Sequence, residues 1–233
     1  MGQLTTIGFD ADDTLWHSER AFRLTEDRFA ELLADYVDAD NLSRRLLETE
    51  RRNLHYYGFG RKGFVLSMIE TAIDVTEGKV PTSVLRDLIE LGREMAAHPI
   101  EILPGVREAL ERTAKRYRIV LITKGDLLDQ EQKLARSNLG ELFQAVEIVS
   151  DKSPLTYQRI FARHGDGPER SMMVGNSLKS DIIPAIEAGS WGVFIPHELT
   201  WSMEHAAAPQ DAPRFRQLER IGELPALLNE IDP

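Results

Sequence analysis

The sequence contains no cysteine among its 233 residues. Disulfide bridges, thiol nucleophiles and thiolate metal sites are therefore excluded. No apolar run approaches the roughly 20 residues that a helix needs to cross a bilayer. The first residues also lack the basic and apolar segments of a signal peptide. These absences lead us to expect a cytoplasmic protein that has no membrane partner.

Basic residues are also in short supply, with 28 Lys and Arg against 38 Asp and Glu and a formal net charge of -10. The acidic excess argues against nucleic acid as a main partner, because a phosphate backbone selects basic surfaces. An anionic substrate would need a local positive site. The apolar content of 42% is ordinary for a globular protein and is enough for a sizeable core. Nothing in the composition indicates an oligomeric state.

One short segment near the start combines an apolar run with clustered acids. Leu4 to Phe9 is apolar and β-branched, which predicts a buried strand. Asp10, Asp12 and Asp13 follow directly. Their like charges repel one another, and such a cluster is tolerated where a cation or a reacting group sits among the carboxylates. Asp10 and Asp12 either point the same way or present one side chain and one backbone carbonyl to a common point. Oxygen ligands of this kind suit Mg²⁺, and the alternative is an Asp-rich turn.

Residues 19 to 98 carry a helical pattern, and no strand is predicted there. Apolar residues recur at helical spacing and favour four helices, at about 22–36, 41–57, 64–75 and 83–97. Ser43 is the expected N-cap of the second helix, and Gly58 its expected end. Because of its three glycines, Gly58–Gly63 is predicted to be a loop, which Arg61 and Lys62 make locally basic.

The pattern after residue 103 alternates between strands and helices. Strands are predicted at 117–122, 145–149, 171–174 and 192–195, and helices at about 106–115, 128–137, 156–164, 182–188 and 226–231. Such alternation predicts an α/β fold with a doubly wound parallel sheet. We therefore expect a core formed by residues 1–16 and 104–233, with a helical domain, 17–103, inserted into it.

Polar side chains occur at the ends of four predicted strands. They are Asp10 with Asp12, Thr123 with Lys124, Lys152, and Asn176 with Asp181. Ligands of parallel sheets bind outside the carboxyl ends of the strands, so these groups are expected to meet in one crevice. Each has a plain structural explanation when taken singly, such as a helix cap for Thr123 or a surface lysine for Lys152. Taken together, they predict an active site.

The order of these residues resembles the haloacid dehalogenase superfamily. Its four motifs correspond here to Asp10-x-Asp12-x-Thr14, Thr123, Lys152 and Gly175-Asn176-Ser177-x-x-x-Asp181. The resemblance covers residues 1–16 and 104–200, and the helical insert lies where members with an α-helical cap domain carry it. The resemblance implies a Rossmann-like core and a Mg²⁺-dependent phosphatase, a hydrolase that acts on a small phosphorylated metabolite.

The resemblance also implies catalytic and metal-binding roles. Asp10 is the expected nucleophile that forms an aspartyl-phosphate, and Asp12 the general acid and then base. Lys152 is expected to neutralise charge between Asp10 and the phosphate. The implied Mg²⁺ ligands are Asp10, the carbonyl of Asp12, Asn176 and Asp181. Asn176 departs from the usual Asp of this motif, so either Asp181 supplies the anionic ligand or metal binding is weaker than usual.

Five residues are expected to bind the substrate. Thr123 and the backbone N–H groups of Lys124 and Gly125 are implied to hold the phosphate oxygens. The Lys124 side chain is expected to touch the substrate, or to pair with Asp181 or Asp126. Arg61 and Lys62 are candidates to contact an anionic substrate from the helical insert, and the alternative for both is a solvated basic turn.

Other functions remain open from the sequence. A phosphomutase would keep Asp12 but retain the phosphoryl group longer, whereas a haloacid dehalogenase would not need Asp12. A phosphonate hydrolase would need a poised lysine in the insert, for which Lys62 is the candidate. A signalling receiver also has a doubly wound sheet, but receivers are shorter and have no cap. Asn176 keeps a catalytically silent binding protein among the alternatives.

Overall fold

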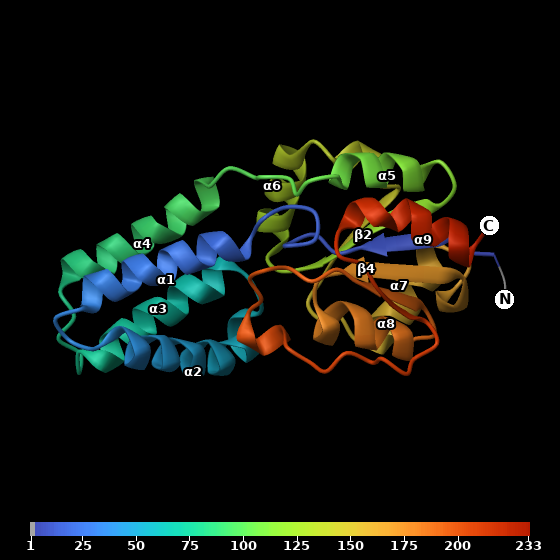
Figure 1. Ribbon diagram of the computed structural model, residues 1–233. Helices are drawn as coiled ribbons and strands as arrows, with labels where there is room; N and C mark the ends of the chain where they lie inside the picture. Colours follow the sequence, from blue (N-terminus) through green and yellow to red (C-terminus); the bar gives the residue numbers. More distant parts are fainter. Residues whose placement is uncertain (1–2) are drawn as a thin grey trace. The chain divides into compact units, whose positions relative to one another are not determined.

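The computed structural model describes residues 3–233 and contains one parallel six-stranded sheet (Figure 1). The strand order is β3-β2-β1-β4-β5-β6. The strands are β1 (Thr6–Phe9), β2 (Arg118–Lys124), β3 (Ala145–Val149), β4 (Ser171–Gly175), β5 (Trp191–Phe194) and β6 (Phe215–Gln217). The predicted doubly wound α/β fold is confirmed. Strand β6 was not predicted, because three residues are too few to show an alternating pattern.

The chain forms two compact units. Unit 1 comprises the described residues up to Glu19, together with Ile100–Lys124 and Gln132–Pro233, and unit 2 comprises Arg20–Pro99 and Gly125–Glu131. The helices of unit 1 are α5 (Val106–Ala114), α7 (Pro154–His164), α8 (Ile183–Glu187) and α9 (Leu224–Ile231). Helix α6 (Leu127–Ser137) begins in unit 2 and ends in unit 1. No helix of residues 3–233 is both long enough and apolar enough to cross a membrane.

Side chains of the strands alternate between two faces of the sheet. Ile7 and Phe9 belong to the cluster that α5 and α9 cover, whereas Ile122 and Phe161 belong to the cluster beneath α7 and α8 (Figure 1). Gly8 points to this second face, and a Cβ there would lie only 2.8 Å from Cδ1 of Ile122. A glycine is therefore needed where β1 meets this layer. Both faces are buried, as expected for a parallel sheet.

Unit 2 contains the four predicted helices and no strand among residues 20–99. They are α1 (Glu19–Leu33), α2 (Ala39–Tyr57), α3 (Arg61–Val75) and α4 (Thr82–Ala97). Their apolar faces enclose a separate core that includes Phe29, Leu46, Met68 and Leu88. This core agrees with the helical spacing of the apolar residues.

Two predicted helix boundaries in this unit are wrong. The N-cap of α2 is Asp38, not Ser43, because the Asp38 carboxylate accepts the N–H of Asn41 at 2.9 Å. The predicted loop Gly58–Gly63 ends early, since α3 already begins at Arg61. A glycine is favoured at position 63 within α3, because a Cβ there would lie only 3.1 Å from the carbonyl oxygen of Gly58. Gly58 does end α2, with φ at 68°.

Candidate active site

The polar groups predicted to converge follow the two central strands of the sheet. Asp10 comes directly after β1, and its N–H donates to the carbonyl of Val174 in β4 at 2.9 Å. Asn176 comes directly after β4. The direction of strand addition reverses between β1 and β4, and ligands of doubly wound sheets bind at such a switch point.

Lys152 lies between two buried carboxylates. Its ammonium group donates to Oδ1 of Asp10 and, at 2.6 Å, to Oδ1 of Asp181. Burial, followed by the charge of Asp181, raises the pKa of Asp10 to about 7 against the opposing effect of Lys152. Burial by itself would lower the pKa of Lys152, but Asp10 and Asp181 together raise it above its usual value. The lysine is therefore a fixed cation beside a carboxylate that is costly to ionise.

Asp181 is held in place by the loop after β4. The N–H of Ser177 donates to its Oδ2 at 2.9 Å. A Cβ on Gly175 would lie only 2.3 Å from this same oxygen, so the glycine makes room for the carboxylate. The glycine of the fourth motif is therefore needed for a packing reason.

Three oxygen-bearing groups converge on the other side of Asp10. One end of the Asn176 side-chain amide lies 3.2 Å from the backbone oxygen of Asp12 and 3.2 Å from Oδ2 of Asp10. The NH₂ end of the amide, if turned there, donates to both oxygens. The amide oxygen, if turned there, lies 3.2 Å from each of these two oxygens, close to the roughly 2.9 Å edge of a Mg²⁺ octahedron. These residues therefore fit Mg²⁺, and the hydroxyl of Thr14 donates to Oδ2 of Asp10 at 3.2 Å.

The carboxylate of Asp12 is held by two donors. Oδ1 accepts the indole N–H of Trp16 at 2.8 Å, and the ammonium of Lys133 lies 2.9 Å from both carboxylate oxygens. Trp16 and Lys133 are buried. Lys133 is a functional candidate that the sequence analysis missed, because no sequence signal distinguishes it from the other polar residues of α6.

Lys124 forms a second ion pair, which is partly buried. Its ammonium donates to the hydroxyl of Ser180 at 2.7 Å and lies 2.8 Å from Oε1 of Glu204. Oε2 of Glu204 accepts the hydroxyl of Ser177 at 2.6 Å. Burial would raise the pKa of Glu204, but Lys124 outweighs it and the pKa is lowered. Lys124 thus pairs with Glu204 in the C-terminal segment, a partner that the sequence analysis did not anticipate.

A family model of haloacid dehalogenase-like hydrolases matches residues 4–189. The chain belongs to this family. The superfamily inferred from the four motifs is thereby confirmed, and the protein is an enzyme of the hydrolase class. A solved haloacid dehalogenase-like hydrolase from Xanthomonas campestris shares 42% identity at a TM-score of 0.88, over 98% of this chain and 92% of that one.

Two curated relatives in this family are phosphatases that differ in substrate. A glyceraldehyde 3-phosphate phosphatase of Methanothermobacter thermautotrophicus is 32% identical over 96 residues, which are 39% of this chain and 42% of that enzyme. The chain thus matches less than half of that relative. The human N-acylneuraminate-9-phosphatase is 22% identical over 100% of this chain and 96% of that enzyme.

Two residues that were predicted to contact the substrate from the helical insert lie in unit 2. Arg61 and Lys62 open α3 in unit 2, where Arg61 pairs with Asp129 and donates to the carbonyl of Met95. The ammonium of Lys62 lies 2.9 Å from both oxygens of Asp126. Both cations are paired within their own unit, and their contact with a substrate stays a prediction.

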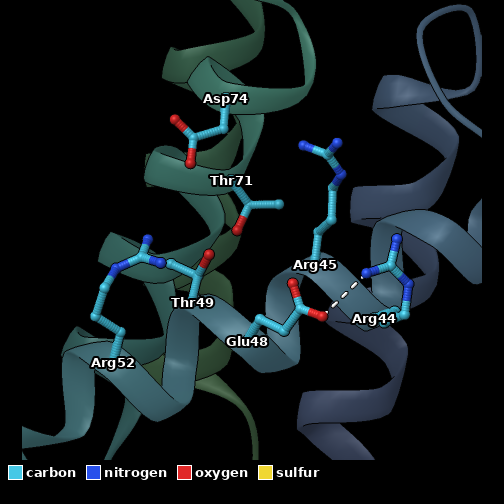
Figure 2. Close-up of a pocket in the computed structure, with 7 residues that line it drawn as sticks. All are labelled: Arg44, Arg45, Glu48, Thr49, Arg52, Thr71 and Asp74. Carbon is cyan, nitrogen blue, oxygen red and sulfur yellow. Dashed lines mark hydrogen bonds and ion pairs between the residues drawn. The ribbon is translucent and has the colours of Figure 1, made fainter.

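A polar cavity of about 280 Å³ lies between α2 and α3 of unit 2 (Figure 2). Its lining contains none of the predicted site residues and consists of Arg44, Arg45, Glu48, Thr49, Arg52, Thr71 and Asp74. Arg44 pairs with Glu48 at 2.9 Å, and Arg52 pairs with Glu70 at 2.6 Å. Acids thus neutralise two of its three arginines, so we do not place the active site there.

Proposed function

We propose that this enzyme is a Mg²⁺-dependent phosphatase that hydrolyses a small phosphorylated metabolite through an aspartyl-phosphate on Asp10. The observation that carries this proposal is that the two carboxylate oxygens of Asp10 have different neighbours. Its Oδ1 faces Lys152, whereas its Oδ2 lies beside the Asn176 amide, which also approaches the backbone oxygen of Asp12. A carboxylate with one oxygen in a cation site and the other beside a lysine is arranged for attack on phosphorus.

In the first step, Oδ1 of Asp10 forms a bond to phosphorus while the bond to the leaving ester oxygen breaks. Asp12 gives its proton to that oxygen, so the leaving group departs as an alcohol. Lys152 offsets the repulsion between the carboxylate and the phosphoryl group. The hydroxyl of Thr123 and the N–H groups of Lys124 and Gly125 are proposed to bind the phosphoryl oxygens.

In the second step, water attacks the phosphorus of the aspartyl-phosphate. Asp12, now a carboxylate, accepts a proton from that water, and the bond between phosphorus and Asp10 breaks. Inorganic phosphate leaves, and both aspartates return to their starting forms. The contacts of Asp12 with Lys133 and Trp16 support this role, because they stabilise the carboxylate that receives the proton.

Asp10, the carbonyl oxygen of Asp12, Asn176 and Asp181 would hold Mg²⁺, which supplies charge neutralisation for the phosphoryl group when bound. Asn176 brings no charge, so Asp10 and Asp181 are the anionic members of this set. We further propose that the four helices of unit 2 act as a cap that selects the leaving group. Their position in the chain between the first and second motifs supports this assignment.

Hydrolysis of a generic aryl phosphate tests the proposal. Wild type, Asp10→Asn and the surface control Asp211→Asn are compared with Mg²⁺ and with excess chelator. We expect turnover in wild type and in the control, with Mg²⁺ only, and none in Asp10→Asn. Turnover that survives in Asp10→Asn, or that is indifferent to chelator, would overturn the proposal. Phosphorylated metabolites with different leaving groups then identify the substrate.

A further inference from the structure

A cluster of three metal-binding side chains lies outside the proposed Mg²⁺ site. It consists of Asp13, which follows the motif aspartates, His17, which precedes α1, and His197, which follows β5. Nε2 of His197 lies 3.3 Å from Nδ1 of His17 and 3.7 Å from Oδ1 of Asp13. The three ligand atoms all lie within 4.8 Å of one another. All belong to unit 1.

The His197 ring is oriented by the backbone. Its Nδ1 lies 2.9 Å from the carbonyl oxygen of Leu199 and 3.2 Å from the N–H of the same residue. With the ring proton on Nδ1, this nitrogen donates to the Leu199 carbonyl and Nε2 keeps a lone pair. A backbone carbonyl that accepts one ring N–H and turns the other nitrogen inward is the usual outer contact of a metal-binding histidine.

Asp13 is fixed just as firmly. Its carboxylate accepts the N–H of Ser18 at 2.8 Å and the N–H of Glu19 at 3.0 Å, at the start of α1. Its backbone is left-handed, with φ at 60°, a conformation that aspartate tolerates better than most residues. These bonds hold the side chain of Asp13 toward His197.

The spacing agrees with a tetrahedral ion. Ligand bonds of about 2.0–2.1 Å at tetrahedral angles place neighbouring ligand atoms roughly 3.3–3.4 Å apart. The distances from Nε2 of His197, 3.3 Å and 3.7 Å, are close to this value. Two imidazoles and one carboxylate suit Zn²⁺, whereas Mg²⁺ prefers a shell of oxygen ligands.

We propose that Asp13, His17 and His197 bind a Zn²⁺ ion at a site separate from the Mg²⁺ site. The ion would join the segment after β5 to the segment that leads into α1. Its effect is structural, so it raises the unfolding temperature and takes no part in phosphoryl transfer. The competing explanation is a metal-free hydrogen bond between the two imidazoles, with Asp13 serving only as the cap of α1.

Titration of the full-length, chelator-treated protein with Zn²⁺ distinguishes these explanations. Calorimetry is carried out with saturating Mg²⁺ present, and Co²⁺ is used in parallel because tetrahedral Co²⁺ gives strong visible absorption bands. We expect one equivalent of Zn²⁺ to bind wild type. His17→Gln and His197→Gln should each weaken binding by about 10-fold or more, whereas the control His55→Gln, an exposed histidine of α2, should bind as wild type does.

Thermal unfolding gives an independent readout. Zn²⁺ should raise the melting temperature of wild type and of His55→Gln but not of either site variant, each of which is first shown to be folded without metal. No binding of Zn²⁺ by wild type would overturn the proposal. Equal binding by wild type and both site variants would also overturn it and would mark adventitious binding. Neither readout depends on turnover, so the outcome is distinguishable from failure of the proposed phosphatase function.

Discussion

The ammonium group of Lys133 lies 2.9 Å from each carboxylate oxygen of Asp12. These residues are 121 positions apart in the chain, and Lys133 is itself buried. A buried cation at this position stabilises the ionised form of Asp12, which is the form that accepts a proton from water. We interpret Lys133 as a positioning residue for the proposed general base.

Replacing this lysine should therefore change the pH profile as well as the rate. We expect Lys133→Met to lower kcat by about 10-fold or more, as befits a perturbed general base. The limb of the pH–rate profile that reports Asp12 should move to higher pH, because the carboxylate loses its neighbouring cation. Lys133→Arg keeps the positive charge, so its kcat and its pH–rate profile should both stay close to those of wild type. An unchanged profile in Lys133→Met would refute this role.

Glu204 should stabilise the fold in a pH-dependent way. Its pKa is lowered from 4.5, so its contribution is present at neutral pH and is lost as the pH falls through the folded-state pKa. We expect Glu204→Gln to reduce the free energy of unfolding by about 2 kcal/mol at pH 7, because the partly buried Lys124 is left without its carboxylate. Urea denaturation should show that the difference from wild type shrinks below pH 4.5.

Two controls accompany the Glu204 experiment. The exposed Glu230→Gln variant should have the same free energy of unfolding as wild type, both at pH 7 and below pH 4.5. The double variant Lys124→Met/Glu204→Met should lose less stability than the sum of its single variants, because the two charges interact. A Glu204→Gln difference that is independent of pH would contradict the assignment.

Gly175 should be intolerant of even one methyl group. The Cβ of an alanine would lie 2.3 Å from Oδ2 of Asp181, so either the carboxylate or the loop must move. We expect Gly175→Ala to cost about 1–3 kcal/mol of stability and to weaken Mg²⁺ binding, measured by calorimetry. Gly222→Ala, which meets no atom within 4 Å, is the matched control and should behave as wild type. Wild-type Mg²⁺ affinity in Gly175→Ala would show that Asp181 does not need this space.

The parts of the fold that are predictable from sequence are those with long, regular patterns. Strand β2 carries a continuous apolar run that is buried on both faces, and α4 carries a clear apolar stripe. The start of α3 is not predictable in this way, since Gly63 is normally a sign of a loop. Only the approach of Gly63 to the carbonyl of Gly58 shows why a glycine stands inside the helix.

The residues of the candidate site also divide into those that could be predicted from the sequence and those that could not. Asp10, Lys152 and Asp181 follow predicted strands and belong to ordered motifs, so their convergence could be anticipated. Lys133 and Glu204 lie in a helix and in an irregular segment, and their partners are 121 and 80 residues away. A pairing at such separations leaves no local pattern, and only the folded chain reveals it.

Trapping the covalent intermediate tests the central claim most directly. In Asp12→Asn, an aryl phosphate whose leaving group needs no proton should still phosphorylate Asp10, whereas hydrolysis of the intermediate should be slow. After acid quenching with Mg²⁺ present, peptide mass spectrometry should find one phosphoryl group on Asp10, and none in Asp10→Asn. The account would be contradicted if wild type turned over the substrate while neither wild type nor Asp12→Asn carried a phosphoryl group on Asp10. A phosphoryl group on another residue would contradict it as well.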